Sequence, residues 1–495
     1  MLLLGYDIGS SSVKASIIDA ETASVIESAY QPKQEMLINA PKTGWAEQDP
    51  ESWWENLKLA TGDVLDKSEI DPDQIGAIGI SYQMHGLVIV DKDYNVLRPS
   101  IIWCDSRAVE IGDKAFNELG NQRCLSSLLN SPGNFTASKL RWVRENEPEI
   151  YEKIHKIMLP GDYIAFRMTG MAMTTISGLS EGIFWDFEES KLGDFLLDHY
   201  GISEDLIPDI VPTFSEQGRL GLGVAAELGL KSGIPVTYRA GDQPNNAFSL
   251  NVLNPGEIAA TAGTSGVVYG VSDEITYDPE SRVNTFAHVN HEKSRPRLGV
   301  LLCINGTGIL YSWLKRNLGP AGIDYDQLNK MALDIPAGAN GLTILPFGNG
   351  AERMLNNKDL GCTIANLNFN IHSDAHIIRA AQEGIVFAFH YGMEIMKNTG
   401  IQPAVIRAGH ANMFLSPVFR ESLAALTGAV IELYDTDGAQ GAAIGAGVGC
   451  GHYPGFKSAF SNLKKIKVIE PDPVIHEPYQ EAYQTWQSEL LRRLA

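Results

Sequence analysis

The sequence is short of the features that mark disulfide-rich, membrane-spanning and nucleic-acid-binding proteins. Its five cysteines are scattered and form no CxxC pair, so neither a zinc site nor a disulfide framework is indicated. Such a chain is typical of the reducing cytoplasm. No apolar run approaches the roughly 18–20 residues that a membrane-spanning helix needs, and the N-terminal MLLLGYDIG lacks the basic start of a signal peptide.

Basic residues are also scarce. The chain has 39 Lys and Arg against 60 Asp and Glu, which gives a formal net charge of −21. Because no basic stripe could neutralise a phosphate backbone, nucleic acid is not expected as a partner. A bound phosphate would have to be held by backbone N–H groups, a helix N-terminus or a metal ion.

The stretch 2–19, LLLGYDIGSSSVKASIID, offers such a phosphate site. Two apolar runs flank a turn made of Gly9 and three serines, which predicts strand, turn and strand. The turn is rich in N–H and hydroxyl donors. Asp7 ends the first run and is suited to holding Mg²⁺ through water, although an aspartate before glycine is commonly a turn cap.

Residues 256–273, GEIAATAGTSGVVYGVSD, repeat this pattern about 250 residues later. Such turns are common in hairpins, so coincidence is one explanation. The other is an internal duplication, with two similar α/β domains that each open with a phosphate-type turn. A chain of 495 residues is too long for a single core, and two such turns across a cleft would suit a nucleotide.

Local signals predict further elements. A second hairpin is expected over 75–97, around the loop Gln83–Gly86. Helices are expected to open at Asp49-Pro50 and at Thr136, and others to end at Gly170, Gly400 and Gly428. The run of small residues over 438–451 predicts a closely packed helix with no direct chemical role.

Asp242 follows the apolar run IPVTY, just before the second strand–turn–strand segment. Transfer of a phosphoryl group to an alcohol needs a carboxylate that accepts the hydroxyl proton, and Asp242 is the candidate base. Gln83 and His85 could hydrogen-bond a polyol, although a lone histidine is usually structural. Trp103, Asp105 and Arg107 combine an aromatic wall with polar groups, as sugar sites and many turns do.

Several segments in their order resemble the FGGY family of carbohydrate kinases, and within it the xylulokinase branch. They are DIGSSSVK, GWAEQDPESWW, SYQMHG, NFTASKLRWVREN, AGDQ, AGTSG and AGHANMFLSPVFRESLAALTG. The resemblance covers nearly the whole chain. It implies two ribonuclease-H-like, actin-type domains with a cleft between them, at 1–240 and 241–465. The last segment, 466–495, is expected to pack on the first domain.

The resemblance also implies a reaction and a set of roles. The γ-phosphoryl group of ATP, with Mg²⁺, would pass to a ketose, with D-xylulose as the favoured acceptor. Asp242 would be the base, with Asp7 and Asp242 facing the metal. The sugar-binding residues would be Gln83, Met84, His85, Trp103, Asp105, Asp242 and Gln243. The phosphate and nucleotide would face Gly9, Ser10, Ser11, Ser12, Lys14, Gly263, Thr264, Ser265, Gly308, Ala408, Gly409 and Asn412. A homodimer fits the resemblance.

The sequence departs from the family pattern at several positions. Gln243 follows the candidate base where xylulokinases usually have Asn, Cys104 replaces a usual Asn, and the adenosine segment reads Ala408-Gly409-His410. Three readings therefore stay open. The chain is a pentulose kinase, a kinase for another ketose or a polyol such as glycerol, or an actin-type ATPase without a sugar acceptor.

Overall fold

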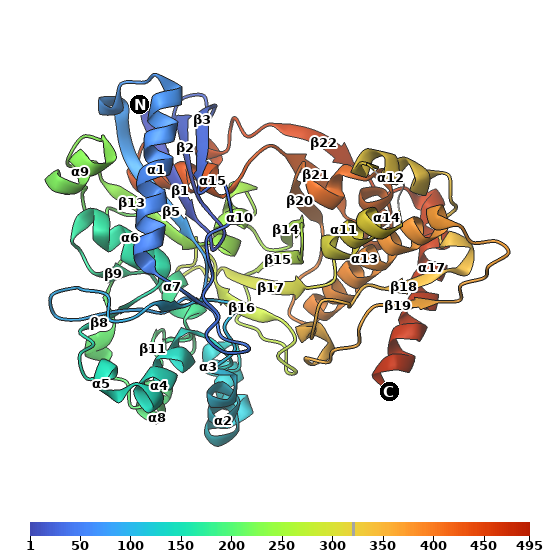
Figure 1. Cartoon of the computed structure of the whole chain (residues 1–495), viewed down its shortest axis with the longest axis horizontal. Coiled ribbons are helices and arrows are strands. Elements are labelled where there is room, and N and C mark those ends of the chain that lie inside the picture. The colour runs from blue at the N-terminus through green and yellow to red at the C-terminus, as the bar shows by residue number, and fades with distance from the viewer. Residues whose placement is uncertain (319–321) are drawn as a thin grey trace. The chain divides into compact units, whose positions relative to one another are not determined.

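The computed structural model describes residues 1–318 and 322–495 and divides into two compact units. Unit 1 comprises Met1–Asn251, Phe286–Arg297 and Thr436–Leu463. Unit 2 comprises Val252–Thr285, Leu298–Asp435 and Lys464–Ala495. Figure 1 shows that both contain sheets with helices packed on them. Within the described residues, none of the helices is long and apolar enough to cross a membrane.

The central sheet of unit 1 has the strand order β13-β5-β1-β2-β3. Its strands are β1 (Leu2–Ile8), β2 (Val13–Asp19), β3 (Val25–Gln31), β5 (Ile75–Tyr82) and β13 (Val236–Gly241). β1 pairs antiparallel with β2, which confirms the strand–turn–strand prediction, and Asp7 lies opposite Lys14. β1 and β5 are parallel, as are β5 and β13.

The predicted hairpin over 75–97 is wrong. β5 lies inside the sheet between β1 and β13, whereas β6 (Val88–Val90) pairs with β8 (Lys156–Met158). The physical reason lies in burial. Six consecutive residues of β5, from Ala77 to Tyr82, are buried, and such a strand needs partners on both edges. The loop 83–86 therefore leads the chain away from the sheet.

The sheet of unit 2 repeats the topology of unit 1. Its full order is β16-β17-β15-β14-β20-β21-β22. The strands are β14 (Glu257–Ala262), β15 (Gly266–Ser272), β16 (Asn284–Ala287), β17 (Leu298–Ile304), β20 (Val405–Gly409), β21 (Val430–Tyr434) and β22 (Lys465–Ile469). β14 is antiparallel to β15 and parallel to β20, as β1 is to β2 and β5. This shared order favours duplication over coincidence.

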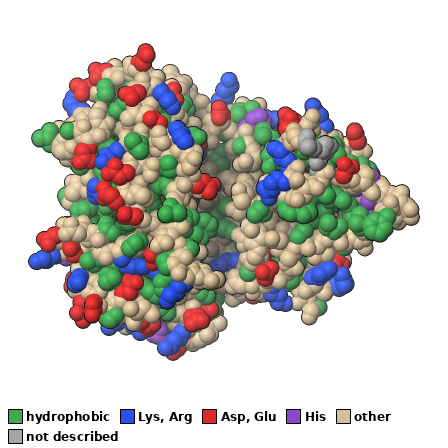
Figure 2. All heavy atoms as spheres, in the orientation of Figure 1, with side chains coloured by type: hydrophobic (Ala, Val, Ile, Leu, Met, Phe, Trp, Pro, Cys, Tyr) green, Lys and Arg blue, Asp and Glu red, His purple; other side chains and the backbone are tan. Residues whose placement is uncertain are grey.

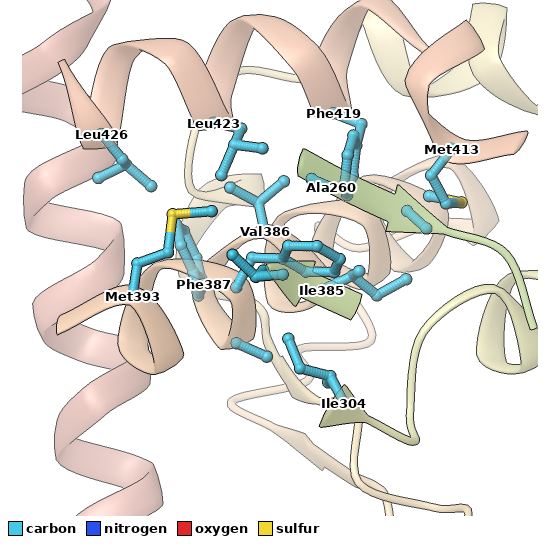
Figure 3. Packing of buried hydrophobic residues seen from close by; sticks show 14 of the residues in the cluster. Ala260, Ile304, Ile385, Val386, Phe387, Met393, Met413, Phe419, Leu423 and Leu426 are labelled. Carbon is cyan, nitrogen blue, oxygen red and sulfur yellow. The ribbon is translucent and has the colours of Figure 1, made fainter. Parts of the chain in front are cut away.

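The largest apolar core of unit 2 is built around the buried helix α13 (Asp374–Lys397) and its neighbour α14 (Pro417–Thr427). Figure 3 shows Phe419 and Leu423 of α14 directed toward Ile385 and Val386 of α13, with Ala260 of β14 close by. α13 ends at Lys397, before the predicted Gly400, whereas α14 ends at Gly428 as predicted.

Three other helix predictions are confirmed in unit 1. α1 (Pro50–Ser68) is capped by the side chain of Asp49 and begins at Pro50. α4 (Thr136–Asn146) opens at Thr136. α6 (Pro160–Thr169) ends at Gly170, whose φ of +73° is the left-handed conformation that glycine adopts without strain.

The run of small residues forms α15 (Gly438–Gly449), which packs on the sheet of unit 1. A Cβ atom on Gly5 would lie 1.9 Å from the carbonyl oxygen of Ala439, and one on Gly79 would lie 2.0 Å from that of Ala442. The predicted close packing is thus confirmed, and glycines on both sides make it possible. The helix also reaches a chemical group, because a Cβ on Gly438 would lie 2.5 Å from Asp7 Oδ2.

The predicted domain boundaries need two corrections. α15 and the segment Phe286–Arg297 belong to unit 1, although both follow residue 240. The C-terminal helix α17 (Pro473–Leu494) packs in unit 2 and not on the first domain. Its buried side chains recur at helical spacing, and Trp486 Nε1 donates to the Ile344 carbonyl oxygen at 2.9 Å. The aromatic face of α17 thereby completes the core of unit 2.

Charged side chains are distributed without a single-sign field on the visible face. Figure 2 shows Asp and Glu interspersed with Lys and Arg, with hydrophobic side chains between them. On this face the acidic side chains are therefore not gathered into one patch.

Candidate active site

Asp242 lies at the first position of helix α10 (Asp242–Ser249), directly after β13. Burial raises the pKa of its carboxyl to about 7, and the negative charge of Asp7 adds to this rise. Hydrogen bonds from the Gln243 backbone and side chain act in the opposite direction. A carboxyl with a pKa near neutrality is suited to accept a proton from an alcohol. Gln243, predicted to bind sugar, contacts the candidate base.

Asp7 is held at the end of β1 by a hydrogen bond of 2.9 Å from the Ser81 hydroxyl to its Oδ1. Burial raises the pKa of its carboxyl, Lys14 lowers it, and the carboxylate of Asp437 raises it further. Asp7 on β1 therefore interacts electrostatically with Asp242 of α10 and with Asp437, the N-cap of α15.

This group of acids fits Mg²⁺. Mutual repulsion between buried carboxylates is relieved by a cation, and carboxylate oxygens are ligands that Mg²⁺ prefers. Among the residues that the structure describes, no cluster of three or more His, Cys, Asp or Glu is close enough to enclose a metal by itself. Asp7 and Asp242 would thus hold the ion with help from water and phosphate oxygens, as Mg²⁺ commonly binds.

The turn over Gly9–Ser12 is closed by a hydrogen bond of 3.0 Å from the Gly9 N–H to the Ser12 carbonyl oxygen. Gln48 fixes its outer side by donating from Nε2 to the carbonyl oxygen of Ser10 at 2.7 Å. The Trp103 Nε1 lies 3.4 Å from Ser10 Oγ. The turn is therefore in contact with one residue of the predicted sugar site.

The loop Gln83–His85 follows β5, the strand next to Asp7. Gln83 Nε2 donates to Gln48 Oε1 at 3.2 Å, and its own Oε1 is buried without a hydrogen-bond partner in the described part of the chain. Met84 is buried, and a Cβ on Gly241 would lie 2.6 Å from Met84 Cγ. The structure thus brings the predicted sugar loop against the residue that precedes Asp242.

His85 is held from several sides. Its φ of +63° is strained for a residue other than glycine. The ring stacks edge-on against Phe135 at 4.9 Å and is tilted against Phe286 at 5.4 Å. The ring Nδ1 is 2.9 Å from the carbonyl oxygen of Glu181, and Lys139 Nζ donates to the His85 carbonyl oxygen at 2.8 Å. These contacts fix the orientation of the imidazole.

Trp103 and Asp105 occupy different environments. The Trp103 side chain is 53% exposed, so its indole face is open to a ligand. Asp105 is fully buried, accepts from the Ala46 N–H at 2.5 Å and is bridged by Arg107, with a shortest contact of 2.7 Å. Both Asp105 oxygens are therefore engaged, which gives this pair a structural role. The predicted sugar contact of Asp105 stays a prediction.

Unit 2 contains a cavity of about 520 Å³ at the turn after β14. It is lined by Ala262, Gly263, Thr264, Gly308, Ile309, Tyr311, Ser312, Arg316, Tyr325, Asp326, Asn329, Asn412, Met413 and Leu415. Four of them were predicted to bind phosphate or nucleotide: Gly263, Thr264, Gly308 and Asn412. Of the described residues, Ser265, Ala408 and Gly409 are not part of this lining, and Ala408 is buried in β20.

The turn beside this cavity is joined to helix α11 (Gly308–Asn317). The Gly308 N–H donates to the Gly263 carbonyl oxygen at 2.9 Å, and the Ile309 N–H donates to that of Thr264 at 3.0 Å. A Cβ on Gly308 would lie 2.3 Å from the Gly263 oxygen, so the close approach requires glycine. A glycine-rich turn locked to a helix N-terminus is suited to phosphate.

The far side of the cavity is aromatic. Tyr325 stacks on Tyr311 with ring centroids 5.7 Å apart, and Lys315 Nζ lies 4.3 Å from the Tyr325 ring centroid. The Tyr311 hydroxyl donates to Asn329 Oδ1 at 2.7 Å. Aromatic and amide groups around an open space are suited to a nucleoside. These residues were missed because no local motif distinguishes them from ordinary helix residues.

Four residues around the sugar loop were also missed: Phe135, Lys139, Glu181 and Phe286. Phe135 and Lys139 both lie in the segment NFTASKLRWVREN, whose likeness to the family pattern was a usable signal. Phe286 is far from His85 along the chain, and no spacing rule connects them. Glu181 is buried beside Gly241, with its Oε2 2.4 Å from where a Cβ would be.

Comparisons with known proteins agree with this geometry. The N-terminal domain of the FGGY family of carbohydrate kinases matches residues 2–249, and its C-terminal domain matches residues 258–450. A xylulose kinase of Bacillus subtilis is 30% identical over 398 residues, which are 80% of this chain and 78% of that protein.

Two further matches cover nearly the full length. An L-xylulose/3-keto-L-gulonate kinase of Escherichia coli is 29% identical over 98% of this chain and 95% of its own. The crystal structure of a xylulose kinase from Rhodospirillum rubrum superposes with a TM-score of 0.89 at 25% identity, covering 99% of both chains.

The fold of both units is thus the ribonuclease-H-like, actin-type fold of these kinases, as predicted. Enzymes of this kind phosphorylate sugars with ATP and Mg²⁺, and both groups of residues described above are suited to those ligands. The chain belongs to the FGGY family of carbohydrate kinases.

Proposed function

We propose that the protein transfers the γ-phosphoryl group of ATP to the terminal hydroxyl, O5, of D-xylulose, and so forms D-xylulose 5-phosphate. The observation that carries the proposal is the contact between the Met84-His85 loop and the Gly241-Asp242 step. The buried Met84 side chain lies against the residue before Asp242, whose carboxyl has a raised pKa, and this supports a sugar site at this place in unit 1.

Each residue has a defined task in this scheme. Asp242 accepts the proton of O5 as the oxygen attacks phosphorus, and Gln243 orients the Asp242 carboxylate. Met84 covers sugar carbon, while His85 and the unpartnered Oε1 of Gln83 meet sugar hydroxyl groups. Bound Mg²⁺ would neutralise charge on the phosphates, held by Asp7 and Asp242. The cavity in unit 2 would hold the nucleotide.

The relatives support a five-carbon ketose. Two of the proteins described above are xylulose kinases, and the E. coli relative is named for L-xylulose and 3-keto-L-gulonate. That relative favours L-xylulose as the second candidate acceptor. Gln243 is one methylene longer than the asparagine usual in xylulokinases. It could move its amide toward a different hydroxyl and relax the choice among pentuloses.

An ADP-release assay with D-xylulose, L-xylulose, ribulose, fructose and glycerol tests the proposal. D-Xylulose is expected to exceed glycerol by at least about tenfold in kcat/KM. Glycerol is too short to satisfy both the His85 loop and Asp242, and each buried group left unpaired costs about 1–3 kcal/mol. Equal kcat/KM values for D-xylulose and glycerol would refute the sugar assignment. ATP turnover indifferent to every sugar would favour the ATPase reading.

We also propose a homodimer in the cytoplasm as the working form, which rests on the family resemblance. Light scattering coupled to gel filtration measures the mass in solution. A dimer is expected at about twice the chain mass of 54.0 kDa. A mass that stays at the monomer value across micromolar concentrations would contradict the dimer.

A further inference from the structure

Lys139 is a fully buried lysine on α4, and its ammonium group donates to two backbone carbonyl oxygens. The distances are 2.8 Å to His85 and 3.0 Å to Ile102. Burial of an ammonium group is expensive unless its donors are satisfied. The charge also interacts with Asp105, Cys104, Arg107 and Glu181, which lie on the elements around it. A methionine or leucine would fill the same space without that cost.

The two acceptors belong to different segments, and each segment carries proposed sugar-binding residues. His85 ends the Gln83–His85 loop, and Ile102 immediately precedes Trp103. Next to these residues, the two segments are joined by a hydrogen bond of 3.0 Å from the Leu87 N–H to the Ile101 carbonyl oxygen. Lys139 makes a second link between the two segments, at the residues beside the proposed sugar site.

The linked loop needs such support. His85 adopts a left-handed backbone conformation that is strained for a residue other than glycine and persists only where the surroundings enforce it. The ring is fixed by Phe135, Phe286 and the Glu181 carbonyl oxygen. Lys139 fixes the backbone of the same residue through its carbonyl oxygen.

We infer that Lys139 is a positioning residue for the sugar, which clamps the Gln83–His85 loop to the Trp103 segment so that both meet the same substrate. It touches neither the sugar nor ATP. Its removal should weaken sugar binding through the two loops and leave nucleotide binding in unit 2 unchanged. The expected effect on sugar binding rests on the proposed function, whereas the link between the two loops rests on the geometry alone.

The test compares Lys139→Met, which keeps the length of the side chain without its donors, with Ser138→Ala as a matched control. Ser138 is the neighbouring residue of α4, is equally buried, and bonds to the Pro132 carbonyl oxygen and the Tyr200 hydroxyl, outside both loops. Lys139→Gln, which keeps an –NH₂ donor, is the second variant if the methionine variant does not fold.

Hydrogen exchange of the full chain without ligands is the first readout. Lys139→Met is expected to speed exchange in peptides covering 83–86 and 102–105, whereas Ser138→Ala is not, and Lys139→Gln should be intermediate. Unchanged exchange in both loops, or equal acceleration by the control, would overturn the clamp. This measurement needs no knowledge of the sugar, so it stands even if D-xylulose proves not to be the acceptor.

Steady-state kinetics are the second readout. The KM for D-xylulose should rise about tenfold to a hundredfold in Lys139→Met, with the KM for ATP within about twofold of wild type. Partial recovery is expected in Lys139→Gln. A loss of kcat with unchanged sugar KM, or an equal rise of both KM values, would overturn the positioning role. A wild type that phosphorylates no ketose would refute the proposed function instead.

Discussion

The two units contain the same strand–turn–strand element, but different side chains surround its turn. In unit 1 the turn follows Asp7, whose carboxylate lies near those of Asp242 and Asp437. In unit 2 the corresponding position is Thr261, and the turn after β14 opens on a cavity with an aromatic side. We propose that this one backbone pattern binds a cation and phosphate where acids surround it, and a nucleotide where tyrosines and asparagines do.

The units also differ in how they anchor the loops at these sites. In unit 1 the buried amino group of Lys139 donates to two carbonyl groups. In unit 2 the buried carboxylate of Glu352 accepts the N–H groups of Asn305 and Gly306, at 3.0 and 3.1 Å, just before Gly308. The buried side chain is a donor where the loop turns carbonyl groups toward it and an acceptor where the loop turns N–H groups toward it. The comparison predicts that substitutions at the sugar loop of unit 1 change the kinetic constants for the sugar. Substitutions at the turn of unit 2 are expected to change the KM for ATP.

The largest effect is expected at Asp242. Asp242→Asn should lower kcat by about 10²–10⁴-fold, because the amide cannot accept the proton of the sugar hydroxyl. Sugar affinity should stay close to wild type, since the group acts on a proton in transit. Single-turnover kinetics and calorimetric sugar titration measure the two quantities. Turnover near the wild-type rate would exclude Asp242 as the base.

His85→Ala should lower kcat/KM for D-xylulose by about tenfold to a hundredfold, because one buried sugar hydroxyl would have no hydrogen-bond partner. The KM for ATP and the sugar-independent hydrolysis of ATP should hardly change, because both depend on unit 2 and on the phosphate turn. Kinetics with each substrate varied in turn give the answer. An unchanged kcat/KM for D-xylulose would show that the His85 loop of unit 1 does not bind the sugar.

Gly308→Ala is the counterpart in unit 2. Its Cβ would lie 2.3 Å from the Gly263 oxygen, so the turn at the cavity must shift. The KM for ATP should rise about tenfold, while that for the sugar stays within about twofold. Gly62→Ala is the control, because a Cβ on that helix glycine would meet nothing within 4 Å. A wild-type KM for ATP in Gly308→Ala would show that this turn does not hold the nucleotide.

The remaining prediction concerns stability and not kinetics. Burial raises the pKa of Glu352 to about 7 from an ordinary value of 4.5. Because the pKa is higher in the folded state, the contribution of this carboxyl to stability is complete below pH 4.5 and is lost as pH rises through about 7. The loss is on the order of 3 kcal/mol.

Glu352→Gln does not titrate and should lack this loss. Urea unfolding at pH 5 and pH 8, followed for both proteins, measures the difference. Wild type is expected to lose more stability over this range than the variant. Parallel losses would show that the Glu352 carboxylate stays ionised, stabilised by its N–H donors, at both pH values.

Local sequence signals predicted much of what is local in the structure. Asp49 and Pro50 mark a helix start because a side-chain oxygen and a missing N–H suit the first turn, and Gly170 marks an end because it tolerates positive φ. The two strand–turn–strand segments were found for a similar reason, since apolar runs and turn residues act over a few positions. The position of Asp242 after an apolar run and the family resemblance both indicated it as the base, which stays a prediction.

Pairing and packing between distant segments were decided by the tertiary structure. The hairpin expected over 75–97 did not form because β5, which is buried on both faces, pairs with β1 and β13, and no local pattern encodes this pairing. The helix α17 joined unit 2 because its aromatic face fits the core around Ile344. In the same way, Phe286 and Lys139 meet His85 only once the chain has folded. Hydrogen bonding and burial depend on distance in space, whereas a sequence records only distance along the chain.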